Sequence, residues 1–193
     1  ILEGIVKQEW GLHLGTRNLL LTTLDKDVLT LMKRAGFTKV PVSAESGNDR
    51  VLAEEMGKKL TIAETERVVR ESVEVGLKPF LNFVIGMPGE KRSEIDQTAE
   101  FARRMKTLGA DGFWFSVATP IYGTAMFQEL VEKNMLPPNF AHRFSYGRGT
   151  FDGLDWTKEQ IQHYRKMLME KLTLLYQYMI FLLPAMLFRC CLH

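Results

Sequence analysis

Three short segments of the sequence combine polar side chains with glycines in a way that suits ligand binding. They are Glu45-Ser46-Gly47, Gly86-Met87-Pro88-Gly89-Glu90 and Thr119-Pro120-Ile121-Tyr122-Gly123-Thr124. A carboxylate such as Glu45 accepts hydrogen bonds from ligand hydroxyls or from an amine. Glycines let the backbone approach a flat or anionic group closely. The plainer alternatives are that Glu45 pairs with Arg50 or Lys58 and that the other two segments are ordinary turns.

Other kinds of catalytic chemistry find no support in the residue pattern. The second segment lacks the Gly-Lys-Ser/Thr ending of a phosphate loop, and no GxSxG nucleophile elbow occurs. The four histidines, at positions 13, 142, 163 and 193, form no metal-binding spacing. The two cysteines, Cys190 and Cys191, are adjacent and cannot by themselves hold an iron–sulfur cluster. We therefore predict no metal ligands within this sequence.

The elements that must position these segments alternate between strand and helix. Apolar or β-rich runs at 18–22, 38–44, 78–85 and 112–118 predict four strands, and helical stripes at 25–36, 61–76, 93–109 and 125–134 follow them. Asp25 and the Thr61/Glu64 capping box mark helix starts. Pro41 favours an edge strand or a bulge, and the unbroken apolar run 78–85 predicts a strand covered on both faces. Such βα units form parallel sheets, in which ligands bind at the carboxyl ends of the strands.

A complete eight-unit barrel needs about 250 residues, so the pattern predicts an open sheet or part of a barrel. We predict two regions, 1–136 for the βα units and 137–193 for a glycine- and aromatic-rich loop with a helical extension. Thr157 and Gln160 form the capping box that opens the long helix of this extension. The uncharged run Leu172–Phe188 is short for a membrane span. We expect a buried or partner-covered helix there, with a weak peripheral membrane contact as the alternative.

Length and charge narrow the class of protein further. The chain has 193 residues, of which 46% are hydrophobic and 25% charged, and its formal net charge is +2. This composition is that of a globular protein, and the balanced charge argues against nucleic acid as a partner. The sequence begins at Ile1 without a secretory signal. We expect a cytoplasmic chain that is a piece of something longer.

The ordered set of segments resembles the radical SAM superfamily, most closely its branch associated with cobalamin-binding domains. The resemblance covers about residues 18–135 and rests on LDKDVLTLMKRAGFTKVPVSAESGNDRVL, TIAETERVVRESVEVGLKPFLNFVIGMPGE and ATPIYGT, in this order. It implies a partial (βα)6 TIM-like barrel of parallel strands. It also implies a 4Fe–4S cluster that reductively cleaves S-adenosylmethionine (SAM), so that a 5′-deoxyadenosyl radical abstracts hydrogen from a substrate.

The resemblance also implies roles for eight residues. Glu45 and the adjoining Ser46 fall where a polar side chain meets the ribose or methionine part of SAM. Val84, Ile85 and Gly86 match the fifth-strand motif, whose backbone binds adenine, and Ala118, Thr119 and Pro120 match the sixth-strand end on the adenine side. No catalytic residue is assigned. The substrate is expected to be a small or lipid-like molecule.

Two departures from the family pattern qualify this expectation. Asn82 stands where the fifth-strand motif usually has glycine. The cluster motif CxxxCxxC and the glycine-rich methionine-binding motif are both absent. We therefore expect the C-terminal part of a radical SAM enzyme, inactive alone, with the cluster and a separate cobalamin domain supplied upstream. The alternatives are a degenerate, non-catalytic binding or scaffold module, membrane-associated through 172–188, and an unrelated α/β barrel enzyme that uses Glu45 as acid or base.

Overall fold

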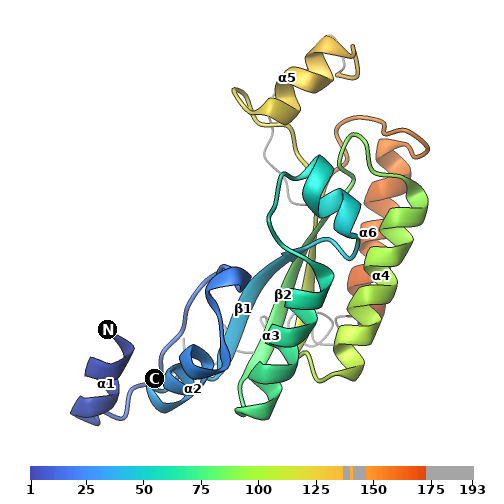
Figure 1. Ribbon diagram of the computed structural model, residues 1–193. Coiled ribbons are helices and arrows are strands. Elements are labelled where there is room, and N and C mark those ends of the chain that lie inside the picture. The colour runs from blue at the N-terminus through green and yellow to red at the C-terminus, as the bar shows by residue number, and fades with distance from the viewer. Residues whose placement is uncertain (137–139, 141–146, 173–193) are drawn as a thin grey trace, which may run out of the picture.

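The computed structural model describes residues 1–136, 140 and 147–172 (Figure 1). Three strands alternate with helices along this part of the chain, and two further short helical turns occur. The elements are α1 (Leu2–Gln8), a 3-10 turn (Leu21–Thr23), α2 (Lys26–Arg34), β1 (Lys39–Glu45), a π-helical turn (Val51–Glu55), α3 (Ile62–Glu74), β2 (Lys78–Ile85), α4 (Arg92–Thr107), β3 (Gly112–Val117), α5 (Ala125–Glu132) and α6 (Lys158–Leu172).

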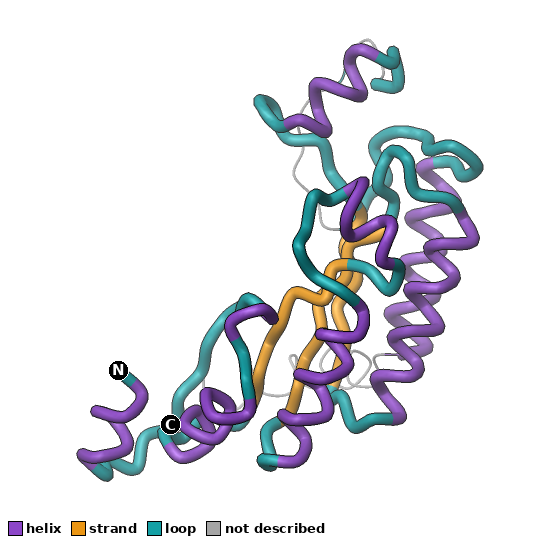
Figure 2. The backbone as a smooth tube through the Cα atoms, viewed as in Figure 1, coloured by secondary structure: helices purple, strands orange, loops and turns teal. Residues whose placement is uncertain are grey.

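The strands form one parallel sheet in the order β1-β2-β3. Helix α3 connects β1 to β2 and helix α4 connects β2 to β3, as in βαβ units (Figure 2). Apart from the first residue of each strand, burial alternates along the strands: the side chains that face the helices are buried, and those on the other face are half-buried. The expectation that 78–85 is covered on both faces is therefore wrong within the described residues. The continuous apolar run hid the alternation, since Phe80 and Val84 lie on the more open face.

Aromatic stacking and the predicted caps fix the helical layer against the sheet. Phe83 stacks on Phe115 with ring centroids 5.1 Å apart and meets Phe101 of α4 edge-on at 6.3 Å. The Asp25 carboxylate accepts from the Val28 amide, and the Thr61/Glu64 capping box is complete. The Thr157/Gln160 box is also present at the start of α6. These caps satisfy helix N–H groups that would otherwise lack partners.

The predicted strand at 18–22 is the main error in the sequence-based fold. Only Leu19 pairs with β1, through bonds to the Pro41 carbonyl at 2.8 Å and from the Ser43 amide at 3.5 Å. The chain then enters the 3-10 turn, because burial of Leu21 and Leu24 turns it toward the core while Leu20 stays exposed. β1 is consequently an edge strand over most of its length, as Pro41 predicts.

The opposite edge of the sheet is covered by side chains of α6. Arg165 Nε donates to the Phe115 carbonyl at 2.6 Å, and the Phe115 amide donates to Met169 Sδ at 3.4 Å. Unpaired strand edges invite pairing with other chains, so α6 blocks this edge of β3. The helix predicted after the Thr157/Gln160 capping box is present as α6. Most of the run Leu172–Phe188, and parts of the loop 139–155, lie outside the described residues. None of the described helices is long and apolar enough to cross a membrane.

Candidate functional site

An open cavity of about 570 Å³ lies on the half-buried face of the sheet. Its size falls in the range of small-molecule sites, about 300–1,000 Å³. Alternate residues of all three strands line it because side chains on a strand point to opposite faces in turn. The lining includes Ser43 and Glu45 of β1, Phe80, Asn82 and Val84 of β2, Trp114 and Ser116 of β3, and then Ala118 and Thr119. The cavity thus offers a carboxylate, an amide and hydroxyls together with apolar and aromatic surface.

Glu45 stands at a strained turn where β1 ends. Its φ is 62°, and the Ser46 amide donates to the Ala44 carbonyl at 2.8 Å across it. A three-residue turn of this kind is rare, and such strain gathers at functional sites. The β1–β2 register also shifts between Ser43 and Glu45. The turn aims the Glu45 side chain at the cavity.

The Glu45 carboxylate contacts Lys58 Nζ at 3.2 Å, and not Arg50. A second open cavity, of about 520 Å³, shares Asn18, Ser43 and Glu45 with the first and adds Lys58 and Lys59. Glu45 therefore separates two adjoining spaces, one of which has basic side chains. A ligand with hydroxyls or an ammonium group could bind Glu45 while its own carboxylate meets a lysine.

The half-buried face of the sheet, which lines the cavity, also carries hydrogen bonds between its own side chains. Asn82 Nδ2 donates to Asn18 Oδ1 at 2.7 Å and to the Val42 carbonyl at 3.3 Å. Trp114 Nε1 donates to Ser116 Oγ at 3.1 Å. The Trp114 side chain lines the cavity. Its place in the period-two alternation, one residue after buried Phe113, is the signal that predicts this.

Four of the eight predicted site residues meet at the cavity: Glu45, Val84, Ala118 and Thr119. The other four do not line it. Ser46 is buried and its hydroxyl lies 3.1 Å from Thr98 Oγ1 of α4. Ile85 is buried because it alternates onto the helix-facing side of β2, and Pro120 is buried in the segment that follows β3. At Gly86, an added Cβ would lie 3.0 Å from Ile161 of α6, so this glycine faces the helix.

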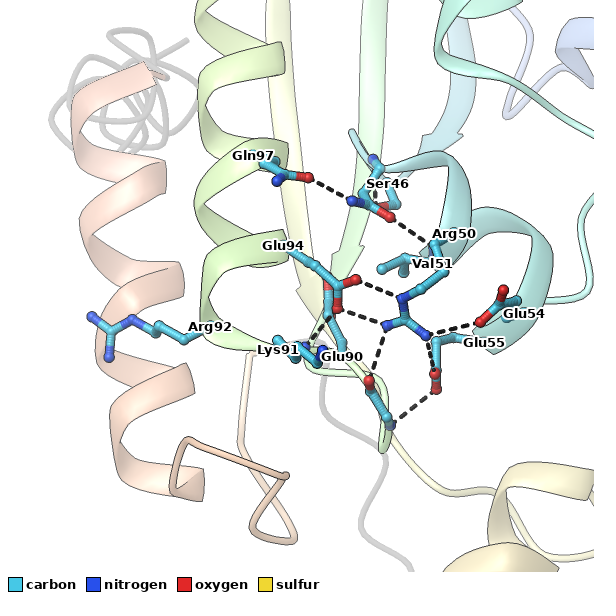
Figure 3. Close-up of polar contacts among 12 residues, drawn as sticks. Ser46, Arg50, Val51, Glu54, Glu55, Glu90, Lys91, Arg92, Glu94 and Gln97 are labelled. Carbon is cyan, nitrogen blue, oxygen red and sulfur yellow. Dashed lines mark hydrogen bonds and ion pairs between the residues drawn. The ribbon is translucent and has the colours of Figure 1, made fainter.

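An ion-pair network joins the loops that follow β1 and β2 (Figure 3). Arg50 forms a bidentate pair with Glu94, at 2.6 Å for both bonds, and a 2.9 Å bond to Glu55. Its guanidinium also donates to the Gly89 carbonyl at 3.0 Å, and the Gly89 amide donates to Glu55 at 2.9 Å. Arg50 thereby lowers the pKa of Glu94 through direct hydrogen bonds. The planar guanidinium of Arg50 fixes the relative position of the two loops through several directed hydrogen bonds, which a lysine ammonium would not reproduce.

Glu90 accepts hydrogen bonds from backbone amides of its own loop, the one that follows β2. Its side chain is fully buried, and Oε2 accepts from the amides of Gly86 at 2.6 Å and Met87 at 3.1 Å. The other oxygen, Oε1, is buried without a hydrogen-bond partner. Burial, with added repulsion from Glu94 and Glu55, raises the pKa of Glu90 to about 7 despite the two amide bonds. The Gly86 amide is therefore already hydrogen-bonded within the loop.

Sequence reasoning missed this network, because its members are far apart in the chain. Glu55 contacts Arg50 and the Gly89 amide, whereas Glu54, its neighbour in the chain, is exposed. Among the described residues, no group of three or more His, Cys, Asp or Glu side chains could hold a metal ion. Cys190 and Cys191 lie outside those residues. The described residues therefore offer no ligand set for an iron–sulfur cluster.

Comparison with known proteins gives this geometry a context. The family model described as the radical SAM superfamily matches residues 1–102. An uncharacterized methyltransferase of Pyrococcus horikoshii is 33% identical over 132 residues, which cover 68% of this chain and 28% of that protein. The cytidylyl-2-hydroxyethylphosphonate methyltransferase of Streptomyces wedmorensis is 29% identical over 161 residues, covering 79% of this chain and 29% of that protein.

Two solved structures share the fold. The radical S-adenosylmethionine methyltransferase TsrM from Kitasatospora setae, with tryptophan substrate and a SAM analogue bound, aligns at a TM-score of 0.60 and 23% identity, covering 74% of this chain and 29% of that one. Coproporphyrinogen III oxidase from Escherichia coli aligns at 0.57 and 12% identity, covering 80% and 31%. These matches confirm a parallel α/β fold of the TIM-like barrel type. The chain spans less than a third of the length of each of these proteins.

Proposed function

The chain belongs to the radical SAM superfamily, and from this premise we propose that it is the C-terminal part of the barrel of a radical SAM enzyme acting on a small molecule. The superfamily uses SAM and a 4Fe–4S cluster. When bound, SAM would supply the reactive group. The part of the barrel described here contributes the walls of the cavity and the residues that hold the nucleoside. The alternative of an unrelated α/β barrel enzyme is wrong, because the radical SAM family model covers more than half of the chain.

The observation that carries the proposal is the meeting of Glu45, Val84, Ala118 and Thr119 at one cavity. In our proposal Glu45 accepts hydrogen bonds from the ribose hydroxyls, a role that suits a carboxylate at a strand end. Val84 and Ala118 provide apolar surface for the adenine ring. Arg50 and Glu90 do not contact the ligand, but they fix the loops beside it.

The finer parts of the proposal have different support. Three thiolates at cluster-motif spacing are needed to hold the cluster, so we propose that another segment of the enzyme supplies them and that this chain alone is inactive. Cobalamin bound by a separate domain is supported by the TsrM structure that holds both cobalamin and a cluster. A small-molecule substrate is supported by the substrates named for TsrM and the Streptomyces enzyme. The division at 136/137 and the membrane contact of the tail stay predictions.

Calorimetry of SAM binding to the cluster-loaded parent enzyme tests the proposal. Glu45→Ala should weaken binding about tenfold, which corresponds to the loss of one or two hydrogen bonds to a charged group. Glu132→Ala, an exposed carboxylate on α5 away from the cavity, should leave the affinity unchanged. Equal affinity of wild type and Glu45→Ala would contradict the role of Glu45. If wild type does not bind SAM at all, the proposed function itself fails and the non-catalytic alternative remains.

A further inference from the structure

A second polar groove lies beside β3, next to the cavity described above. It is an open space of about 550 Å³ between the loop Gly147–Gly149 and the first turns of α6. Its lining carries four permanent positive charges, Arg148, Lys158, Arg165 and Lys166, against one negative charge, Glu159. The net charge of the whole chain is only +2. Positive charge is therefore concentrated here far beyond its average over the surface.

The arginine at the base of this groove is held in place. Arg165 is half-buried, its Nε donates to the Phe115 carbonyl, and its guanidinium lies over the Trp114 ring at 5.3 Å from the centroid. Its geometry is thus set by the sheet, and little side-chain entropy remains to be lost when it meets an anion. Trp114 lines the catalytic cavity and Arg165 lines the groove, so the two spaces adjoin at this pair.

The loop that forms the other wall can approach α6 only because it contains glycines. An added Cβ on Gly149 would lie 2.2 Å from the Lys158 carbonyl oxygen, and one on Gly147 would lie 3.0 Å from Arg165 Nη1. This close approach brings Arg148 to the same groove as Lys158 and Lys166. The salt contacts of the two lysines, to Glu159 and Glu170, are both 3.9 Å long and solvent-exposed, so a stronger anion can displace them.

We propose that this groove binds a phosphoryl dianion, a phosphate or phosphonate group carried by the small-molecule substrate. The inference rests on the proposed function for its link to catalysis, because the group would be held at the Trp114–Arg165 pair while the rest of the molecule enters the cavity. Arginine forks and lysine charges are the usual partners of phosphoryl oxygens. A dianion also matches the net charge of the lining better than a carboxylate does.

Inorganic phosphate is the first probe, and it can be titrated into the chain without SAM or a cluster. We expect saturable heat in calorimetry and a change in tryptophan fluorescence from Trp114, both weakened by added KCl. Arg148→Gln and Lys166→Gln should each reduce the affinity about tenfold, the effect of losing one charge-assisted contact. Lys106→Gln, an exposed lysine on α4 outside the groove, should leave it unchanged.

Further arms of the titration distinguish the sources of the anion. Sodium acetate at equal ionic strength should bind far more weakly than phosphate, and vesicles of phosphatidylcholine with phosphatidic acid should not bind. Absence of phosphate binding, equal effects of all three variants, or acetate binding as tight as phosphate would overturn the proposal. Vesicle binding that Arg148→Gln abolishes, without binding of free phosphate, would replace the soluble substrate by a lipid. Because none of these arms needs SAM, their failure is separate from failure of SAM binding in the parent enzyme.

Discussion

Replacement of Glu90 by glutamine tests whether a buried carboxylate holds the loop after β2. Glu90 has a pKa of about 7 in the folded chain and 4.5 as its ordinary value. Below about pH 4.5 both the folded and the unfolded state bind the proton, so the ionisation of Glu90 does not affect stability. Above about pH 7 both states are ionised, and the folded state bears the cost of the buried charge. Since one pKa unit corresponds to about 1.4 kcal/mol, this cost is about 3 kcal/mol.

Glutamine keeps an acceptor for the Gly86 and Met87 amides but carries no charge. We therefore expect the free energy of unfolding of wild type to fall relative to that of Glu90→Gln as the pH rises from about 4.5 to about 7. The difference between the two proteins should change by about 3 kcal/mol over this window. The variant gains stability relative to wild type at high pH, because only wild type then carries a buried charge at this position.

Urea unfolding followed by circular dichroism at a series of pH values measures this difference. Glu132→Gln, an exposed carboxylate on α5, serves as the matched control and should run parallel to wild type. Parallel profiles for wild type and Glu90→Gln would refute the reasoning, because they would mean that burial does not perturb this carboxyl. If Glu90→Gln instead lost stability relative to wild type as the pH rises, the predicted sign of the effect would be refuted.

Three other substitutions probe the loops around the cavity. Arg50→Lys should lower the free energy of unfolding by about 2 kcal/mol, since a lysine cannot reproduce the bidentate pair with Glu94, and urea unfolding would show no loss if the fork is dispensable. Glu45→Gly should leave the unfolding free energy unchanged or raise it by about 1 kcal/mol, because it relieves the positive φ, while SAM binding in the parent enzyme falls; a clear loss of stability would argue against strain at this turn. Gly47→Ala places a Cβ 2.6 Å from Phe101 Cβ and should lower the free energy of unfolding by about 2 kcal/mol, which a lower thermal midpoint would show. The control Gly15→Ala, whose added Cβ has nothing within 4 Å, should leave the midpoint unchanged.

The sequence predicts the repeating parts of this fold well. Strand runs at 38–44, 78–85 and 112–118, and the caps at Asp25, Thr61 and Thr157, appear as expected because each depends on local periodicity or on bonds within one helical turn. The run at 18–22 fails as a strand, since only one of its residues finds a pairing partner. A strand needs a neighbour, and local sequence does not show whether one is present.

The candidate site was predicted in part for the same reason. Loop positions at the strand ends follow from topology, which is why Glu45, Val84, Ala118 and Thr119 meet. Which neighbours face the cavity depends on the exact alternation, which Ser46 and Ile85 illustrate by pointing to the helices. The bonds of Arg50 to Glu94 and to the Gly89 carbonyl arise only when the two loops pack together. No spacing in the sequence encodes these contacts.

Hydrogen–deuterium exchange of the cluster-loaded parent enzyme with and without SAM tests the central claim most directly. If the strand ends described here hold the nucleoside, SAM should protect the amides of segments 43–47, 84–87 and 117–120 together, while the outer helix 62–74 is unaffected. SAM binding that protects other parts of the enzyme but none of these three segments would contradict the account.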